Sequence, residues 1–199
     1  MNRSVDDNKL LTVLPIIFRD QKQLLMKKHV FLASAVILMI ASAFTFFEAQ
    51  NWKIAEGYSV KFDGGDPSGE FTGLKGTVQF DEKNLAASKF DATVDVATIN
   101  TGNGMKNTHA KSANWFDAEK YPTIHFTSSA ITKTANGYEA KGTLEMHGIQ
   151  KEYTIPFTFA NNAFTSNFEV NRHDFKLDDG KHEKMLPNMK VSLVVPVTK

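Results

Sequence analysis

The stretch Tyr138–Phe159, which reads YEAKGTLEMHGIQKEYTIPFTF, decides the fold of this chain. Apolar and polar residues alternate along both of its halves, and His147-Gly148 separates the halves. Alternation with a period of two is typical of a β-strand that buries one face. The stretch therefore predicts two consecutive antiparallel strands joined by a tight turn. The apolar faces hold Tyr138, Ala140, Gly142, Leu144 and Met146 in the first half and Tyr153, Ile155, Phe157 and Phe159 in the second.

The same alternation recurs on both sides of this hairpin. Turn residues punctuate it at Ala135-Asn136-Gly137 and Asn161-Asn162, because Gly and Asn tolerate a positive φ. Gly73 and Gly76 interrupt an earlier strand and shift its apolar parity, which predicts a bulge or a sharp bend. The pattern predicts eight strands, at 57–63, 69–81, 86–97, 122–133, 137–147, 150–160, 163–171 and 188–198.

Eight successive antiparallel strands with one apolar face each predict an all-β fold, either an up-and-down barrel or a two-sheet sandwich. A short helix is expected in the loop after the third strand, where Met105, His109 and Ala113 share one face. In a barrel of eight strands the interior is either filled by side chains or wide enough for one small ligand. The residues alone leave both interiors open.

The composition excludes several classes of protein. The chain has 199 residues, of which 42% are hydrophobic and 16 are Phe, with no Cys and a net charge of +1. Without cysteine there is no disulfide scaffold, zinc-thiolate site, iron–sulfur cluster or cysteine nucleophile. The balanced charge argues against a nucleic-acid partner, which would require a basic excess.

An apolar run of 18 residues without a charge, Val30–Phe47, precedes the strands. Met26-Lys27-Lys28 stands before this run and Ala41-Ser42-Ala43 lies near its end, so residues 26–43 have the order of a secretory signal peptide. The run also reaches the short end of a membrane-spanning helix, so an uncleaved anchor is the alternative. Residues 1–25 form an unusual extension in front of a signal, and we hypothesise that translation starts at Met26.

Both interpretations place the strands outside the cytoplasm. The segment before the apolar run carries six basic residues against three acidic ones, and a basic flank of this kind stays in the cytoplasm. The rest of the chain holds 17 basic and 19 acidic residues, so the strand region is mildly acidic. We expect a periplasmic or otherwise extracytoplasmic protein. The N-terminal segment would hold it at the membrane if the leader is not cleaved.

Residues 50–198 resemble the YceI-like family of exported lipid- or polyisoprenoid-binding proteins. The order and spacing of several motifs carry the resemblance, and no single motif does so alone. The motifs are Trp52, Ser59–Phe62, Phe80-Asp81, Ile99–Thr101, His109–Ser112, Trp115–Ala118, Lys120–Ile124, Phe126–Ser128, Gly142–Leu144, His147-Gly148, Arg172–Phe175 and a closing strand with Val191.

The resemblance implies an eight-stranded, lipocalin-like barrel whose long apolar interior holds one isoprenoid or similar lipid chain. The sequence departs from the family's usual pattern at Lys106-Asn107, Ala110, Trp115 and Lys176. We expect these positions to surround the mouth of the barrel, where the head group of a ligand would lie.

Ten residues are predicted to bind such a ligand. Phe suits the wall around a chain without polar atoms, because an unpaired buried polar group costs about 1–3 kcal/mol. His109, Trp115 and Arg172 are expected near the mouth, where Arg172 either anchors a loop or contacts a head group. The residues expected to line or back the interior are Phe90, Val94, Phe126, Leu144, Phe157, Phe159 and Phe168.

The sequence predicts no catalytic residue, metal site or cofactor. His109, His125, His147 and His173 lack the short spacing of metal ligands, and nucleophile-elbow and dinucleotide motifs are absent. We therefore expect a non-enzymatic carrier or sequestering protein for a polyisoprenoid, a quinone or a similar lipid. The alternatives left open are a structural or partner-binding barrel with a filled core and an extracytoplasmic enzyme acting on a lipid-like substrate. The expected partner is the lipid ligand, and a homodimer is also left open.

Overall fold

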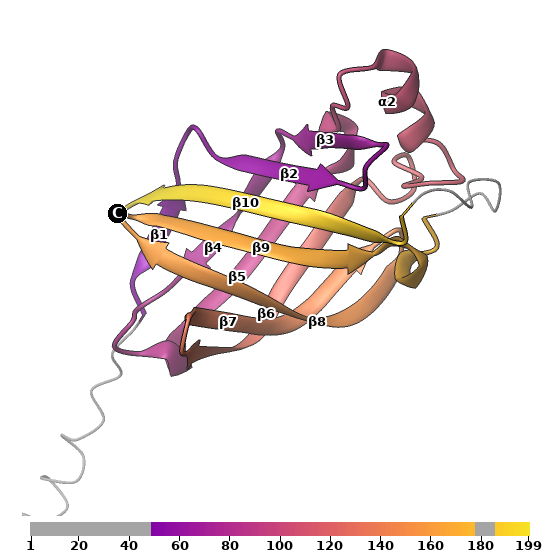
Figure 1. Cartoon of the computed structure of the whole chain (residues 1–199). Helices are drawn as coiled ribbons and strands as arrows, with labels where there is room; N and C mark the ends of the chain where they lie inside the picture. Colours follow the sequence, from indigo (N-terminus) through magenta and orange to yellow (C-terminus); the bar gives the residue numbers. More distant parts are fainter. Residues whose placement is uncertain (1–48, 178–185) are drawn as a thin grey trace, which may run out of the picture. The chain divides into compact units, whose positions relative to one another are not determined.

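Antiparallel β-strands make up most of the computed structural model, which describes residues 49–177 and 186–199 (Figure 1). The predictions for residues 1–25 and 26–43 lie outside the described residues. The strands are β1 (Asn51–Ile54), β2 (Ser59–Asp63), β3 (Ser68–Phe71), β4 (Leu74–Gln79), β5 (Lys89–Asp95), β6 (Thr123–Thr134), β7 (Gly137–Met146), β8 (Ile149–Ala160), β9 (Ala163–Asn171) and β10 (Asn188–Thr198). The helical elements are η1 (Leu85–Ala87), η2 (Val96–Thr98), α2 (Gly104–Ala110) and η3 (Arg172–Phe175).

The strands close into a ring. Hydrogen-bonded neighbours follow the order β1-β4-β5-β6-β7-β8-β9-β10, and β1 pairs with β10 through Ile54 and Val197. β2 pairs with β10 farther along, from Asp63 opposite Lys190 to Ser59 opposite Val194, and β3 pairs with β2. β1 and β2 therefore act as one interrupted strand, as do β3 and β4. The predicted eight-stranded antiparallel barrel is confirmed in the described part of the chain.

The interruption between β3 and β4 falls where the sequence predicted a bend. β3 ends at Phe71 and β4 begins at Leu74. Gly76 has φ of +153°, and a Cβ there would lie 2.3 Å from the backbone oxygen of Asp91, so only glycine fits against β5. The short strand β1 was not predicted, because four residues are too few for alternation to stand out.

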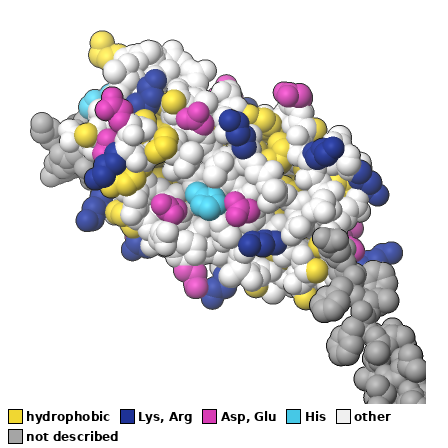
Figure 2. All heavy atoms as spheres, turned by 180° about the vertical axis from the view of Figure 1, so that it is seen from behind, with side chains coloured by type: hydrophobic (Ala, Val, Ile, Leu, Met, Phe, Trp, Pro, Cys, Tyr) yellow, Lys and Arg dark blue, Asp and Glu magenta, His cyan; other side chains and the backbone are white. Residues whose placement is uncertain are grey.

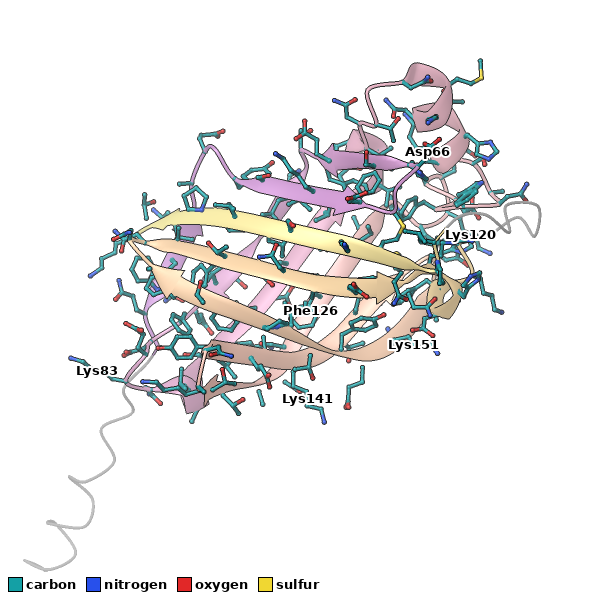
Figure 3. The ribbon with its side chains drawn as sticks, in the orientation of Figure 1. Asp66, Lys83, Lys120, Phe126, Lys141 and Lys151 are labelled. Carbon is teal, nitrogen blue, oxygen red and sulfur yellow. The ribbon has the colours of Figure 1, made fainter. Side chains whose placement is uncertain are left out.

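The hairpin of β7 and β8 has the faces that the sequence predicted. Tyr138, Ala140, Gly142, Leu144 and Met146 are buried inside the ring, and the residues that alternate with them face outward. Figure 3 shows Phe126 of β6 within the ring of strands and Lys141 of β7 on its outer side. On the outer face drawn in Figure 2, basic and acidic side chains are interspersed.

The two ends of the barrel differ. At one end, here called the helix end, lie α2, η3 and the loop 64–67 (Figure 1). At the other end, here called the floor end, lie the turns at 135–136 and 161–162 and the chain's C-terminus. No helix in the described residues is both long enough and apolar enough to cross a membrane.

The helix α2 is shorter and more exposed than expected. The side chain of Asn103 caps it by accepting hydrogen bonds from the backbone N–H groups of Met105 and Lys106, at 3.0 and 3.2 Å. The helix ends at Ala110, so Ala113 is not part of it. Met105 is 83% exposed, and α2 buries no residue fully. The expected apolar face therefore does not pack as a core face, since α2 stands beyond the strands.

Candidate functional site

The interior of the barrel is hollow. A cavity of about 1170 Å³ runs between the strands, and its wall is formed mainly by aliphatic and aromatic side chains. Ligand pockets for small molecules commonly measure about 300–1,000 Å³, so this one is large. The alternative of a barrel with a filled core is therefore wrong for the described structure.

Nine of the ten residues predicted to bind a ligand line this cavity. They come from five different strands, from α2 and from the segments that follow α2 and β9, so only the closed ring brings them together. The nine are Phe90, Val94, His109, Trp115, Phe126, Leu144, Phe157, Phe168 and Arg172.

Phe159 does not line the cavity but stands behind its wall, which is one of the two places, lining or backing the interior, that the sequence predicted for it. Its ring packs against Trp52 at 5.2 Å, Phe80 at 5.2 Å and Phe164 at 4.6 Å between ring centroids. It shares the inward face of β8 with Phe157 but lies two residues nearer the floor end. There the aromatic rings meet and fill the barrel, so Phe159 backs the cavity from below.

Three rings close the cavity at the floor end. Phe90, Phe157 and Phe164 all line it, and their centroids lie 5.2–5.9 Å from one another. Phe80 lies behind all three, at 5.3–6.1 Å, is only 1% exposed and does not line the cavity. We call Phe90, Phe157 and Phe164 the floor. It is a packed aromatic layer at which the hollow space ends.

Sequence reasoning missed a large part of the wall. The inward residues of β10 were recognised as an apolar face but were not assigned to the site, and the same holds for Phe164. A rule that takes every inward position between the floor and the mouth would have found them. The missed wall residues include Ile124, Ile155, Phe164, Val191, Leu193 and Val195.

Polar side chains reach the cavity mainly at the helix end. Lys106 of α2 forms an ion pair with Asp66 of the loop 64–67. Trp115 donates a hydrogen bond from Nε1 to Nε2 of His109 at 2.8 Å. All four residues line the cavity, so charged and hydrogen-bonding side chains gather at the mouth, whereas the interior wall is mainly apolar.

Arg172 lies at the mouth but is 3% exposed. Its Nη1 donates to the backbone oxygen of Leu177 at 3.0 Å, and its Nε donates to that of Leu186 at 3.2 Å. The guanidinium thus joins the chain after η3 to the chain before β10. This agrees with the expectation that Arg172 anchors a loop.

The fully buried polar side chains around the cavity have hydrogen-bond partners. Among the described residues, no buried side-chain nitrogen or oxygen lacks a hydrogen-bond partner. Ser166, a buried residue of the wall, donates its hydroxyl to the backbone oxygen of Pro156 at 2.5 Å. The hydrogen of the Ser166 hydroxyl is therefore already used within the protein, and most of the side chains around it in the wall are apolar.

The shifted pKa values belong to groups outside the cavity wall. Burial raises the pKa of Tyr153, and a hydrogen bond to Glu82 raises that of Tyr138. A hydrogen bond with Tyr121 raises the pKa of Lys120. None of these three groups lines the cavity. In the described residues there is also no group of three or more acidic or histidine side chains placed to hold a metal ion.

The YceI-like domain profile matches residues 46–198. The chain belongs to the YceI-like family. It is 33% identical to Protein YceI of Escherichia coli O17:K52:H18 over 87 residues, which is 44% of this chain and 46% of that protein. It is 34% identical over 83 residues to the UPF0312 protein plu2095 of Photorhabdus laumondii, covering 42% and 43%. These matches span just under half the length of the curated relatives.

Solved structures share the fold. The crystal structure of Burkholderia cenocepacia BcnA superposes with a TM-score of 0.68 at 25% identity, covering 74% of this chain and all of that one. A polyisoprenoid binding domain from Saccharophagus degradans superposes with a TM-score of 0.53 at 13% identity, covering 74% and 97%. At that identity the second likeness concerns the fold alone.

The departures from the usual YceI-like pattern lie mostly at the mouth. Lys106, Ala110 and Trp115 line the cavity there. The side chain of Asn107 accepts hydrogen bonds from the backbone N–H and the hydroxyl of Thr101, at 2.8 and 2.7 Å, and so fixes the chain ahead of α2. Lys176 ends η3 with φ of +53°, a left-handed conformation that glycine adopts more readily.

Proposed function

We propose that this protein is a non-enzymatic carrier or sequestering protein that holds one long apolar chain, such as a polyisoprenoid or a quinone tail, inside its barrel. The observation that carries the proposal is the cavity of about 1170 Å³ with an apolar wall and an aromatic floor. The name of the Saccharophagus degradans domain, which shares the fold, supports a polyisoprenoid ligand. The leader sequence supports action outside the cytoplasm.

The size of the cavity fits a chain and exceeds what a small metabolite needs. A water-sized group takes about 30 Å³ in a liquid, so the cavity has room for at most on the order of 40 such groups. Each methylene removed from water contributes about 0.8 kcal/mol, so a chain of several isoprene units gains enough to bind without specific contacts.

The polarity of the cavity sets the direction in which such a ligand enters. Lys106, His109 and Asp66 are at the mouth, whereas the floor consists of phenylalanine rings. A ligand with one polar end therefore binds with its apolar tail toward the floor and its head at the mouth, because burying an unpaired polar head at the floor is unfavourable.

The proposal is tested by extracting freshly purified protein with organic solvent and identifying apolar molecules by mass spectrometry. A prenyl alcohol is then added to delipidated protein, and binding is measured directly. We expect an extracted lipid or saturable binding of the prenyl alcohol. Recovery of no apolar molecule together with no binding would refute the proposal.

A pair of neighbouring residues on β7 provides a matched control. Leu144 lines the cavity and is 5% exposed, whereas Thr143 points outward and is exposed. Leu144→Glu is expected to abolish binding of the prenyl alcohol, since a carboxylate would stand against the chain. Thr143→Glu introduces the same carboxylate on the outer face and should leave binding intact. Circular dichroism is used to check that both variants fold.

A further inference from the structure

The floor of the cavity carries an inference that rests on the proposed function and goes further. We propose that the floor is a ruler: Phe90, Phe157 and Phe164 set the maximum length of the chain that the barrel accepts. The geometry points to this because the cavity ends at these three rings and is filled solidly behind them.

The packing of the floor makes it a hard stop. Phe80 contacts all three floor rings from behind, and Tyr138 stacks on Phe157 with centroids 5.4 Å apart. Trp52 and Phe159 pack edge to face farther back, at 5.2 Å. Close-packed rings leave no void into which a ligand could extend, and a packed core resists insertion of even one further methylene.

The depth of the cavity follows from the strands. On β9 the chain runs from Phe164 at the floor to Arg172 just past the end of the strand at the mouth. Eight residues at about 3.3 Å each give about 26 Å along the strand, or roughly 20 Å along the axis of a barrel with ordinary strand tilt. Beyond this depth, additional chain stays outside the barrel.

The ruler predicts a break in the dependence of affinity on ligand length. Each methylene buried in the cavity raises affinity roughly fourfold, and a methylene left in water adds nothing. Affinity therefore rises with chain length until the tail touches the floor and then stops rising. The position of this break measures the distance from mouth to floor.

The experiment uses a ladder of polyprenols that differ by one isoprene unit, bound to the delipidated protein and competed in mixtures analysed by native mass spectrometry. Phe157→Ala removes a ring about as large as one isoprene unit, so the break is expected to move to chains longer by about one unit. Phe164→Leu makes a smaller change in the same direction and carries the test if Phe157→Ala does not fold.

A second kind of variant shortens the cavity and should move the break in the opposite direction. Ala140 lines the cavity on β7 opposite Ile155, two residues above Phe157 on β8. Ala140→Leu places additional carbon atoms directly above the floor, so the break should move to shorter chains by about one isoprene unit. Phe168→Ala, in the middle of the wall on β9, is the matched control and should lower affinity for all lengths with the break unmoved.

The outcomes separate the ruler from the proposed function. Breaks that move up for Phe157→Ala or Phe164→Leu and down for Ala140→Leu support the ruler. A break at the same length in the wild type and all variants would overturn the ruler while leaving the carrier function standing. Failure of the wild type to bind any polyprenol would overturn the ruler, and together with the recovery of no apolar molecule on extraction it would also overturn the carrier function.

Discussion

Replacing Phe80 by Ala and Phe168 by Ala compares a packed ring with a ring that faces empty space. Phe80 is 1% exposed and lies within 6.1 Å of five other rings by centroid distance. Phe168 is half-buried and faces the cavity. If the barrel is hollow around Phe168 and packed around Phe80, replacing each Phe by Ala must lower the free energy of unfolding by different amounts.

The expected magnitudes follow from burial. Phe80→Ala removes a buried ring and leaves a void, so we expect it to lower the free energy of unfolding by about 3–5 kcal/mol. Phe168→Ala loses contacts on one side of the ring and creates no new closed cavity, so its cost is the transfer term, about 1.5–3 kcal/mol at most. A saturating ligand at 100 times its Kd stabilises the protein by about 2.7 kcal/mol.

Urea unfolding followed by circular dichroism measures both variants, with and without an added prenyl alcohol. Phe168→Ala is expected to reduce the stabilisation by ligand, because its ring lines the binding space, whereas Phe80→Ala should leave most of it. Equal costs for the two substitutions without ligand would refute the reasoning, since they would mean that the ring of Phe168 is packed as tightly as that of Phe80.

Three further outcomes are expected from the same unfolding assay. Gly142→Ala should lower the free energy of unfolding by about 1–3 kcal/mol, because a Cβ there would lie 2.2 Å from a backbone oxygen of β6. A loss below about 0.5 kcal/mol, which is ordinary for a surface substitution, would contradict this. Arg172→Met should cost about 1–3 kcal/mol by leaving the carbonyl of Leu177 without its donor, and an unchanged midpoint would contradict the anchoring role. The hydrogen bond to Glu82 raises the pKa of Tyr138 in the folded protein, so the unfolded chain loses the phenol proton at a lower pH. The free energy of unfolding should therefore fall as the pH rises above about 10. This fall should be less steep in Tyr138→Phe, which has no phenol proton to lose.

The barrel could be predicted because its strands each show one apolar face over many residues. β7 and β8 alternate without a break, so both their existence and their inward faces followed from the sequence. β1 was not predicted because it has only four residues. The predicted strand 69–81 is divided into β3 and β4, and the only sign of this division in the sequence is the pair of glycines that shifts the apolar alternation.

The cavity could not be predicted from the residues alone. A phenylalanine on an inward face is the same signal whether it packs against another ring, as Phe159 does, or faces a hollow, as Phe126 does. A packed ring and a cavity-facing ring differ in where they lie along the barrel axis, because opposite walls touch at one end and not at the other. Strand pairing determines this position, and the periodicity of the sequence does not encode strand pairing. Hydrogen bonds such as that from Trp115 to His109 likewise depend on loop geometry.

The separation of a packed floor from a hollow wall explains how a chain without cysteine can leave so much of its interior empty. The floor concentrates aromatic burial at one end, where Phe80 and its neighbours supply close packing, so the walls around Phe126 and Phe168 do not have to fill the barrel. The floor end of the strands thus supplies most of the close packing, and the rest of the same strands surrounds the space for a ligand. Substitutions at the floor should therefore affect both folding and ligand length, whereas those higher in the wall should affect mainly affinity.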